Sequence, residues 1–230
     1  MEFVLYIAVI VAALLALGAQ IGVSTTFNRY SRVATRQGRT AEEVARLMLR
    51  AEGLNDVRIE RVHGRLSDHY DPRTKTLRLS DGVYGNASAA AIGVACHEAG
   101  HAIQHARAYA PLKLRSALVP VTSFASRAWW IIVVLGSLLL NFGSYFGQNL
   151  ILAGIFLFAF TTLFQLVTLP CELDASTCAL RAMRATGYFE SSELVGARRV
   201  LKAAALTYVA AAVVSLLQLL RLIMIFRRRD

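Results

Sequence analysis

The chain contains 41 consecutive residues without a charge, from Trp129 to Leu169. A helix of about 20 apolar residues crosses a bilayer, so this stretch fits two spans joined by a polar turn near 141–144 or 147–149. Two further uncharged runs, Phe3–Val23 and Ala203–Leu220, each suit one more span. Because the chain is 56% hydrophobic and the excess lies in these blocks, we predict a mainly α-helical integral membrane protein with four spans.

The charged residues lie between these blocks and are mostly basic. The net charge is +10, with 16 Lys and Arg against 9 Asp and Glu between positions 24 and 128. The positive-inside rule places these charged segments in the cytoplasm and the uncharged turn outside. The basic tail from Arg227 would then lie outside if the last run crosses fully, so either that run stops short or the tail departs from the rule. We expect no nucleic-acid partner, because acids are mixed with the basic residues and no recognition motif accompanies them.

The motif His97-Glu98-Ala99-Gly100-His101 falls in the middle of an expected helix that begins after Asn86–Ser88 and ends before Pro111. Residues four apart share one helix face, so His97 and His101 can hold one zinc ion together. Glu98 lies beside them, where a carboxylate can accept the proton of an attacking water. The motif predicts a zinc site with Glu98 as its base.

The third metal ligand is expected near Pro170, which we interpret as a break before a new helix. Glu172 would lie in the first turn of that helix and complete a His₂Glu set. Asp174 is the competing candidate, two residues on and on another face. His105 lies ~12 Å along the axis from His97 and is interpreted as a helix-face or cleft residue, not as a ligand.

A small α+β lobe is predicted ahead of the motif. Thr40–Met48 forms an amphipathic helix with a capping box, and Gly53 ends it. Val57–Val62 and Thr76–Ser80 alternate like strands, and Asp68–Pro72 between them is expected to be a loop.

Within that loop, His69 and Tyr70 are accessory candidates that could stabilise an oxyanion or shield the site. The alternative that we favour for them is a turn-capping histidine and a core tyrosine.

The expected organisation therefore has a small α+β catalytic lobe of the zincin kind among membrane helices. The segments are a transmembrane anchor (1–23), the catalytic lobe with the HExxH helix (24–128), a transmembrane hairpin (129–169), the helix with the third zinc ligand (170–202), a C-terminal membrane helix (203–226) and a basic tail (227–230).

With these residues assembled, the chain resembles the bacterial YugP-type neutral zinc metallopeptidases almost end to end. The resemblance rests on six runs: SDHYDPR at 67–73, LRLS at 77–80, HEAGHAIQ at 97–104, YAPLKLRSALVP at 109–120, FQLVTLPCELDAS at 164–176 and the tail at 202–222. It implies a zinc metallopeptidase of the bacterial cell membrane with His97, His101 and Glu172 as ligands and Glu98 as base.

The chain is more distantly similar to membrane proteases of the HtpX and CAAX-processing kind. These carry Glu-x-x-x-Asp at the third ligand, whereas Ser176 stands at the Asp position here. The carboxylate that usually steadies a ligand histidine is therefore missing from that place, and Asp174 could replace it only from an irregular helix start.

The functional expectation is a zinc metalloendopeptidase that acts from the cytoplasmic face on membrane proteins or their juxtamembrane peptides. The alternative is a membrane scaffold or chaperone-like protein that keeps zinc without proteolysis. A closed site with four protein ligands would favour the scaffold, whereas three ligands with a poised Glu98 favour the enzyme.

Overall fold

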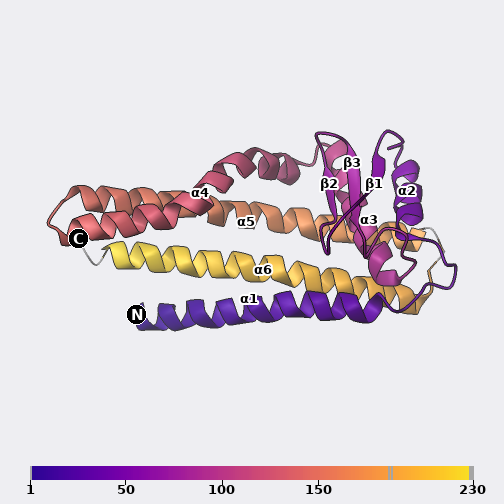
Figure 1. Ribbon diagram of the computed structural model, residues 1–230, viewed down its shortest axis with the longest axis horizontal. Coiled ribbons are helices and arrows are strands. Elements are labelled where there is room, and N and C mark those ends of the chain that lie inside the picture. Colours follow the sequence, from indigo (N-terminus) through magenta and orange to yellow (C-terminus); the bar gives the residue numbers. More distant parts are fainter. Residues whose placement is uncertain (1, 186, 188, 228–230) are drawn as a thin grey trace. The chain divides into compact units, whose positions relative to one another are not determined.

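The computed structural model describes residues 2–185, 187 and 189–227, and residues 228–230 of the expected basic tail lie outside this part. The protein is mainly α-helical with one small sheet (Figure 1). Its elements are α1 (Glu2–Tyr30), α2 (Ala41–Ala51), β1 (Arg58–Val62), β2 (His69–Asp71), β3 (Thr76–Ser80), α3 (Ala89–Ala106), α4 (Ala110–Asn141), α5 (Phe146–Ala185) and α6 (Ser191–Arg227).

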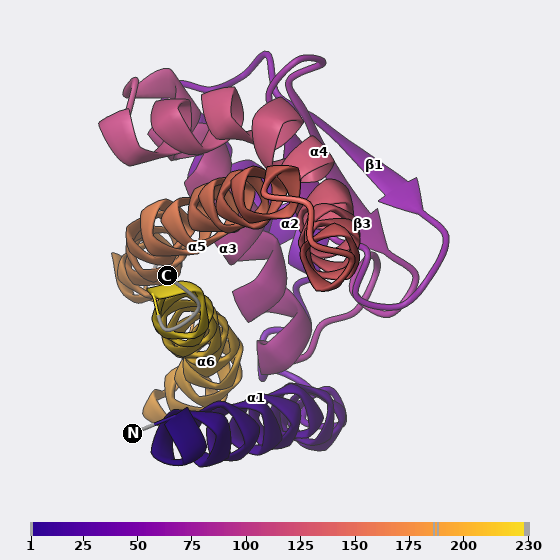
Figure 2. The same cartoon turned by 90° about the vertical axis from the view of Figure 1, so that its left-hand side faces the viewer.

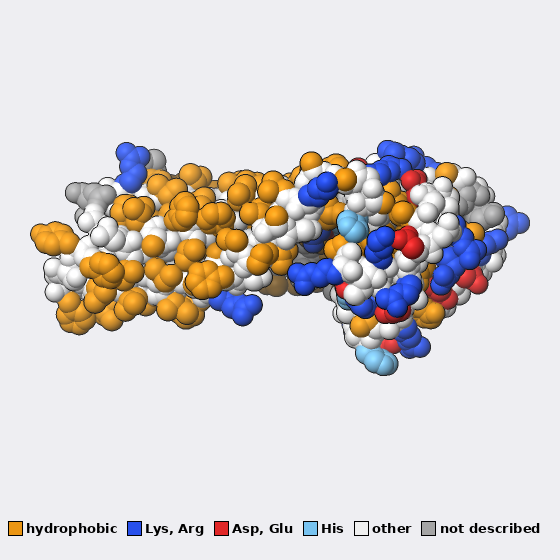
Figure 3. Space-filling view, turned by 90° about the horizontal axis from the view of Figure 1, so that it is seen from above, with side chains coloured by type: hydrophobic (Ala, Val, Ile, Leu, Met, Phe, Trp, Pro, Cys, Tyr) orange, Lys and Arg blue, Asp and Glu red, His pale blue; other side chains and the backbone are white. Residues whose placement is uncertain are grey.

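Two compact units make up the fold. The helical unit consists of 1–18, 114–169 and 208–230, and the mixed unit consists of 19–113 and 170–207. Within the described residues, four helices are long and apolar enough to cross a membrane, as predicted: Phe3–Tyr30, Ala110–Asn141, Phe146–Ala185 and Ser191–Arg227. Figure 3 shows hydrophobic side chains covering the visible face of the helical unit, while the charges gather on the mixed unit. Such an exposed apolar surface suits lipid, not water.

The helical unit contains the predicted hairpin. Its turn falls at 142–145, between α4 and α5, which confirms the first of the two expected turn positions. Glycines let the two helices approach closely: a Cβ added at Gly136 would lie 2.7 Å from the Gly147 carbonyl oxygen, and one added at Gly154 would lie 3.0 Å from that of Trp129. Small residues at such positions are how helices pack within lipid.

In the mixed unit, the sheet has the order β1-β3-β2. β3 pairs in parallel with β1, which is labelled beside it in Figure 2, and antiparallel with β2 (Figure 1). Both β2 and β3 contact α3, and α2 packs on the same helix. The core between them is formed by buried aliphatic side chains, among them Leu49, Leu77, Leu79, Ile92 and Ile103. The sheet and α2 thus hold the motif helix α3 in place.

Three expectations about element boundaries are wrong. Pro170 does not begin a helix but lies inside α5, which runs without interruption from Phe146 to Ala185. The segment 170–202 is therefore not one helix, because α5 ends at Ala185 and α6 begins at Ser191 and continues to Arg227. The expected loop 68–72 contains β2, since His69–Asp71 pair with Thr76–Arg78 of β3.

Candidate metal centre

The helix α3 carries the motif, and its first turn is stabilised as predicted. Ser88 is the N-cap, and its hydroxyl accepts a hydrogen bond from the Ala91 N–H at 3.2 Å. Gly100 allows α5 to come close, because a Cβ there would lie only 2.8 Å from the Ala175 carbonyl oxygen. The motif helix and the α5 segment that follows Pro170 are thus in direct backbone contact.

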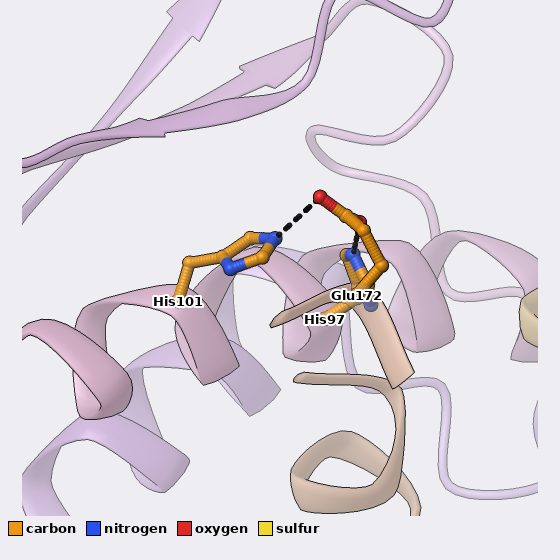
Figure 4. Close-up of side chains that lie close together, drawn as sticks. All are labelled: His97, His101 and Glu172. Carbon is orange, nitrogen blue, oxygen red and sulfur yellow. Dashed lines mark hydrogen bonds and ion pairs between the residues drawn. The ribbon is translucent and has the colours of Figure 1, made fainter. Parts of the chain in front are cut away.

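This close contact brings three predicted ligand residues together (Figure 4). His97 and His101 project from α3 toward Glu172 of α5. His97 Nε2 lies 3.1 Å from Glu172 Oε2, and His101 Nε2 lies 3.6 Å from Glu172 Oε1. The ligand atoms of all three lie within 4.8 Å of one another. Among the residues that the structure describes, no further His, Cys, Asp or Glu joins the group.

The geometry of this group fits a zinc ion. Tetrahedral ligands ~2.1 Å from a zinc ion lie about 3.4 Å apart, close to the separations found here. The outer nitrogen of each imidazole has its own partner. His97 Nδ1 lies 3.1 Å from Ser176 Oγ, and His101 Nδ1 lies 3.0 Å from Gln104 Oε1. Both Nε2 atoms are therefore left to face a metal, as is usual for ligand histidines.

Glu98 is held beside the group by the edge strand β2. Its Oε2 accepts a hydrogen bond from the backbone N–H of Tyr70 at 3.1 Å. Burial raises the pKa of the Glu98 carboxyl. The imidazoles of His101 and His97 lower this pKa, whereas the carboxylates of Glu172 and Asp68 raise it. A carboxyl with a raised pKa is better suited to exchanging a proton near neutral pH.

The accessory candidates lie outside the group of three. His69 is exposed and its Nδ1–H donates to the Ser67 carbonyl at 2.8 Å, which is turn chemistry. The Tyr70 hydroxyl lies 3.0 Å from His105 Nδ1, so these two side chains form a pair, while the backbone N–H of Tyr70 contacts Glu98. Asp174 does not point at the ligand atoms; it accepts a hydrogen bond from Gln104 Nε2 at 2.8 Å.

The comparisons with known proteins agree with this geometry. Residues 5–227 match the family described as "Putative neutral zinc metallopeptidase". The chain belongs to this family. It is also 47% identical over 223 residues to the "Putative membrane protease YugP" of Bacillus subtilis (strain 168), covering 96% of both chains. The comparison with solved structures gives no match. The chain is thus a membrane protein of a zinc metallopeptidase family, with a group able to hold a metal ion.

Two residues near the group were not expected to serve it. Ser176, which interrupts the Glu-x-x-x-Asp pattern, still reaches His97 because α5 is already helical at that point. Gln104 reaches His101 from one turn further along α3. A signal for Gln104 was present in the sequence, since residues three apart in a helix lie on the same face.

Proposed function

We propose that this protein is a membrane-embedded zinc endopeptidase in which His97, His101 and Glu172 hold the metal and Glu98 is the general base. The observation that carries the proposal is the open group of three ligand atoms with a fourth, proton-accepting carboxylate beside it. Zinc held there would supply Lewis-acid chemistry. It would polarise the carbonyl of the peptide bond and lower the pKa of a bound water to about 7.

The residues of the chain divide the remaining work. Tyr70 N–H occupies Oε2 of Glu98, so Oε1 is the atom available to take the proton of the attacking water. Glu98 then gives this proton to the departing amine, which completes hydrolysis of the peptide bond. The raised pKa of Glu98 favours the first transfer, because a more basic carboxylate is a better acceptor for the proton of the attacking water.

The proposed substrates are membrane proteins or their juxtamembrane segments, and the proposed location of the centre is the cytoplasmic face of the bacterial cell membrane. Four candidate spans and the likeness to a membrane protease support a substrate at the bilayer. The excess of Lys and Arg between positions 24 and 128 supports the cytoplasmic side. Two candidate spans separate residues 31–109 from residues 189–190, so both segments would face the same side.

The scaffold alternative is tested by Glu98→Gln in the full-length protein. Glutamine keeps the size of the side chain but cannot act as a base, so cleavage of a single-span model substrate should fall by about 10²–10⁴-fold. Zinc content, measured on the purified protein, should remain about one per chain because Glu98 lies outside the group of three. His97→Ala and His101→Ala should lose that zinc.

Glu60→Gln is the matched control, since it is the same substitution on the partly exposed strand β1 of the same unit. It should retain both zinc and cleavage. If Glu98→Gln cleaves as fast as Glu60→Gln, Glu98 is not the base. If the wild-type protein holds zinc but cleaves nothing and Glu98→Gln fully complements a cellular loss of the protein, the scaffold function replaces the enzyme.

A further inference from the structure

Gln104 is a fully enclosed polar residue that neither the motif nor the proposed reaction uses. Only 2% of its surface is exposed, and it lies one helical turn after His101 on α3. Its side chain makes three hydrogen bonds, one to His101 and two to α5. A buried amide with every contact directed at the metal group and its neighbouring helix indicates a role in that group.

The α5 contacts fix which way the amide of Gln104 points. The Cys171 carbonyl oxygen lies 2.9 Å from Nε2, and Asp174 Oδ2 lies 2.8 Å from the same nitrogen. A carbonyl oxygen and a carboxylate oxygen both accept hydrogen bonds, so the NH₂ group must face them. The amide oxygen Oε1 is therefore turned toward His101.

The orientation of the amide in turn fixes the tautomer of His101. Oε1 can only accept, and it lies 3.0 Å from His101 Nδ1, so Nδ1 must carry the proton. In a neutral imidazole the lone pair then sits on Nε2, the atom that faces Glu172. A metal ion needs this lone pair.

We propose that Gln104 is a positioning residue that, held by Asp174 and the Cys171 carbonyl, fixes the ring and tautomer of His101 for metal binding. The inference rests on the proposed ligand role of His101. The contact of His97 differs, because the Ser176 hydroxyl can donate or accept and does not by itself select a tautomer. The tautomer of His97 is therefore not fixed by its neighbour, whereas that of His101 is. We call the hydrogen bonds that run from the Cys171 carbonyl and Asp174 through the Gln104 amide to His101 the amide relay.

The relay makes a specific demand on charge and hydrogen-bond direction. Gln104→Met keeps the approximate volume but removes all three hydrogen bonds. Gln104→Glu keeps an acceptor for His101 but places a second carboxylate against Asp174 and loses both donors to α5. Exchanging the two groups, in Gln104→Glu combined with Asp174→Asn, restores one amide and one carboxylate, now with the NH₂ of residue 174 donating to residue 104.

The test measures zinc affinity of the full-length protein in detergent by competition with a chelator, together with the absorption spectrum of the cobalt-substituted protein. Gln104→Met and Gln104→Glu should each weaken zinc binding by about 10–100-fold, the usual effect of losing such a supporting contact. The exchanged double variant should recover part of this loss and shift the cobalt spectrum back toward that of the wild type, because it restores the contact between residues 104 and 174 but not the donor to the Cys171 carbonyl. A residue that only fills space would not be rescued by reversing the hydrogen bond.

The control is Thr76→Val, which removes a buried hydroxyl from β3 of the same unit. It should lower the melting temperature of the metal-free protein without changing zinc affinity. If Gln104→Met binds zinc like Thr76→Val, or if the double variant binds no better than Gln104→Glu, the relay does not exist. Because affinity is measured without a substrate, failure of the relay is separate from failure of the Glu98 test.

Discussion

Near the metal group, the backbones of α3 and α5 come closest at Gly100 and Ala175. Enlarging Gly100 tests directly how far the positions of His97, His101 and Glu172 tolerate a shift. In Gly100→Ala the new Cβ would lie 2.8 Å from the Ala175 carbonyl oxygen and 3.1 Å from the Ala175 Cα. Ordinary contacts between such atoms begin near 3.4 Å. Both partners are backbone, so α5 itself must move away by roughly half an ångström, since no side chain can rotate to make room.

Two energetic effects of Gly100→Ala nearly cancel in the free energy of unfolding. Overpacking costs about 1–3 kcal/mol. Replacing a helical glycine by alanine returns about 1 kcal/mol through helix propensity. The metal-free protein should therefore be destabilised by only about 0–2 kcal/mol.

Metal binding should respond much more strongly. Glu172 lies one turn before Ala175 on α5, so it moves with the displaced helix. Metal-ligand distances tolerate only about ±0.2 Å, less than the expected displacement. We expect zinc affinity to fall by at least about tenfold, as for loss of a supporting contact.

Gly93→Ala on the same helix is the matched control. Its Cβ would lie 3.2 Å from the Ala197 Cβ of α6, a contact with a different helix that does not carry Glu172. It gains the same helix propensity and should leave zinc affinity unchanged. Chelator competition and thermal unfolding of both variants decide the matter: equal zinc affinity for Gly100→Ala and Gly93→Ala would refute the reasoning.

Three further expectations concern the third ligand, the sheet and the topology. Glu172→Gln should weaken zinc binding and abolish cleavage, and zinc analysis showing an unchanged content would remove Glu172 from the ligand set. The pKa of Asp71 is held at about 2 instead of 3.8 by hydrogen bonds from Thr74, Arg73 and Arg78, so its stabilising effect is complete above 3.8 and lost as pH falls toward 2. The melting temperature of Asp71→Asn should thus lie below that of the wild type above pH 4, with the gap closing toward pH 2; a gap independent of pH contradicts this. Cysteines introduced at positions 73 and 190 should react with impermeant reagents only from the cytoplasmic side and one at position 145 only from outside, and labelling of 73 and 190 from opposite sides would exclude the proposed centre.

Local patterns predicted those parts of the protein that depend on few residues. The four candidate spans follow from uncharged runs, the strand Thr76–Ser80 follows from its alternation, and the grouping of His97 with His101 follows from helical spacing. Glu172 was expected near them because the motif lacked a third ligand and because the resemblance to the YugP-type metallopeptidases implied it. Each of these predictions uses a period or a chemical requirement that can be read directly in the sequence.

The parts that sequence reasoning missed depend on distant partners. Pro170 suggested a helix break, but α5 continues through it, as helices of membrane proteins often do when neighbouring groups compensate for the lost hydrogen bond. The three-residue strand β2 forms because it pairs with β3 and packs against α3, and no local pattern reveals these two contacts. The orientation of Gln104 likewise depends on acceptors that lie 67 and 70 residues away in the sequence.

The separation of His97 and Glu172 by 75 residues has a consequence for how the protein is made. The intervening chain contains all of α4 and the hairpin turn, so the ribosome must synthesise both before the third ligand exists. A metal ion that joins the two ends closes this long loop and favours the inserted hairpin over the unassembled chain. Metal loading would thus report that the hairpin is complete, and a nascent or truncated chain that stops before Glu172 would remain without hydrolytic capacity in the membrane.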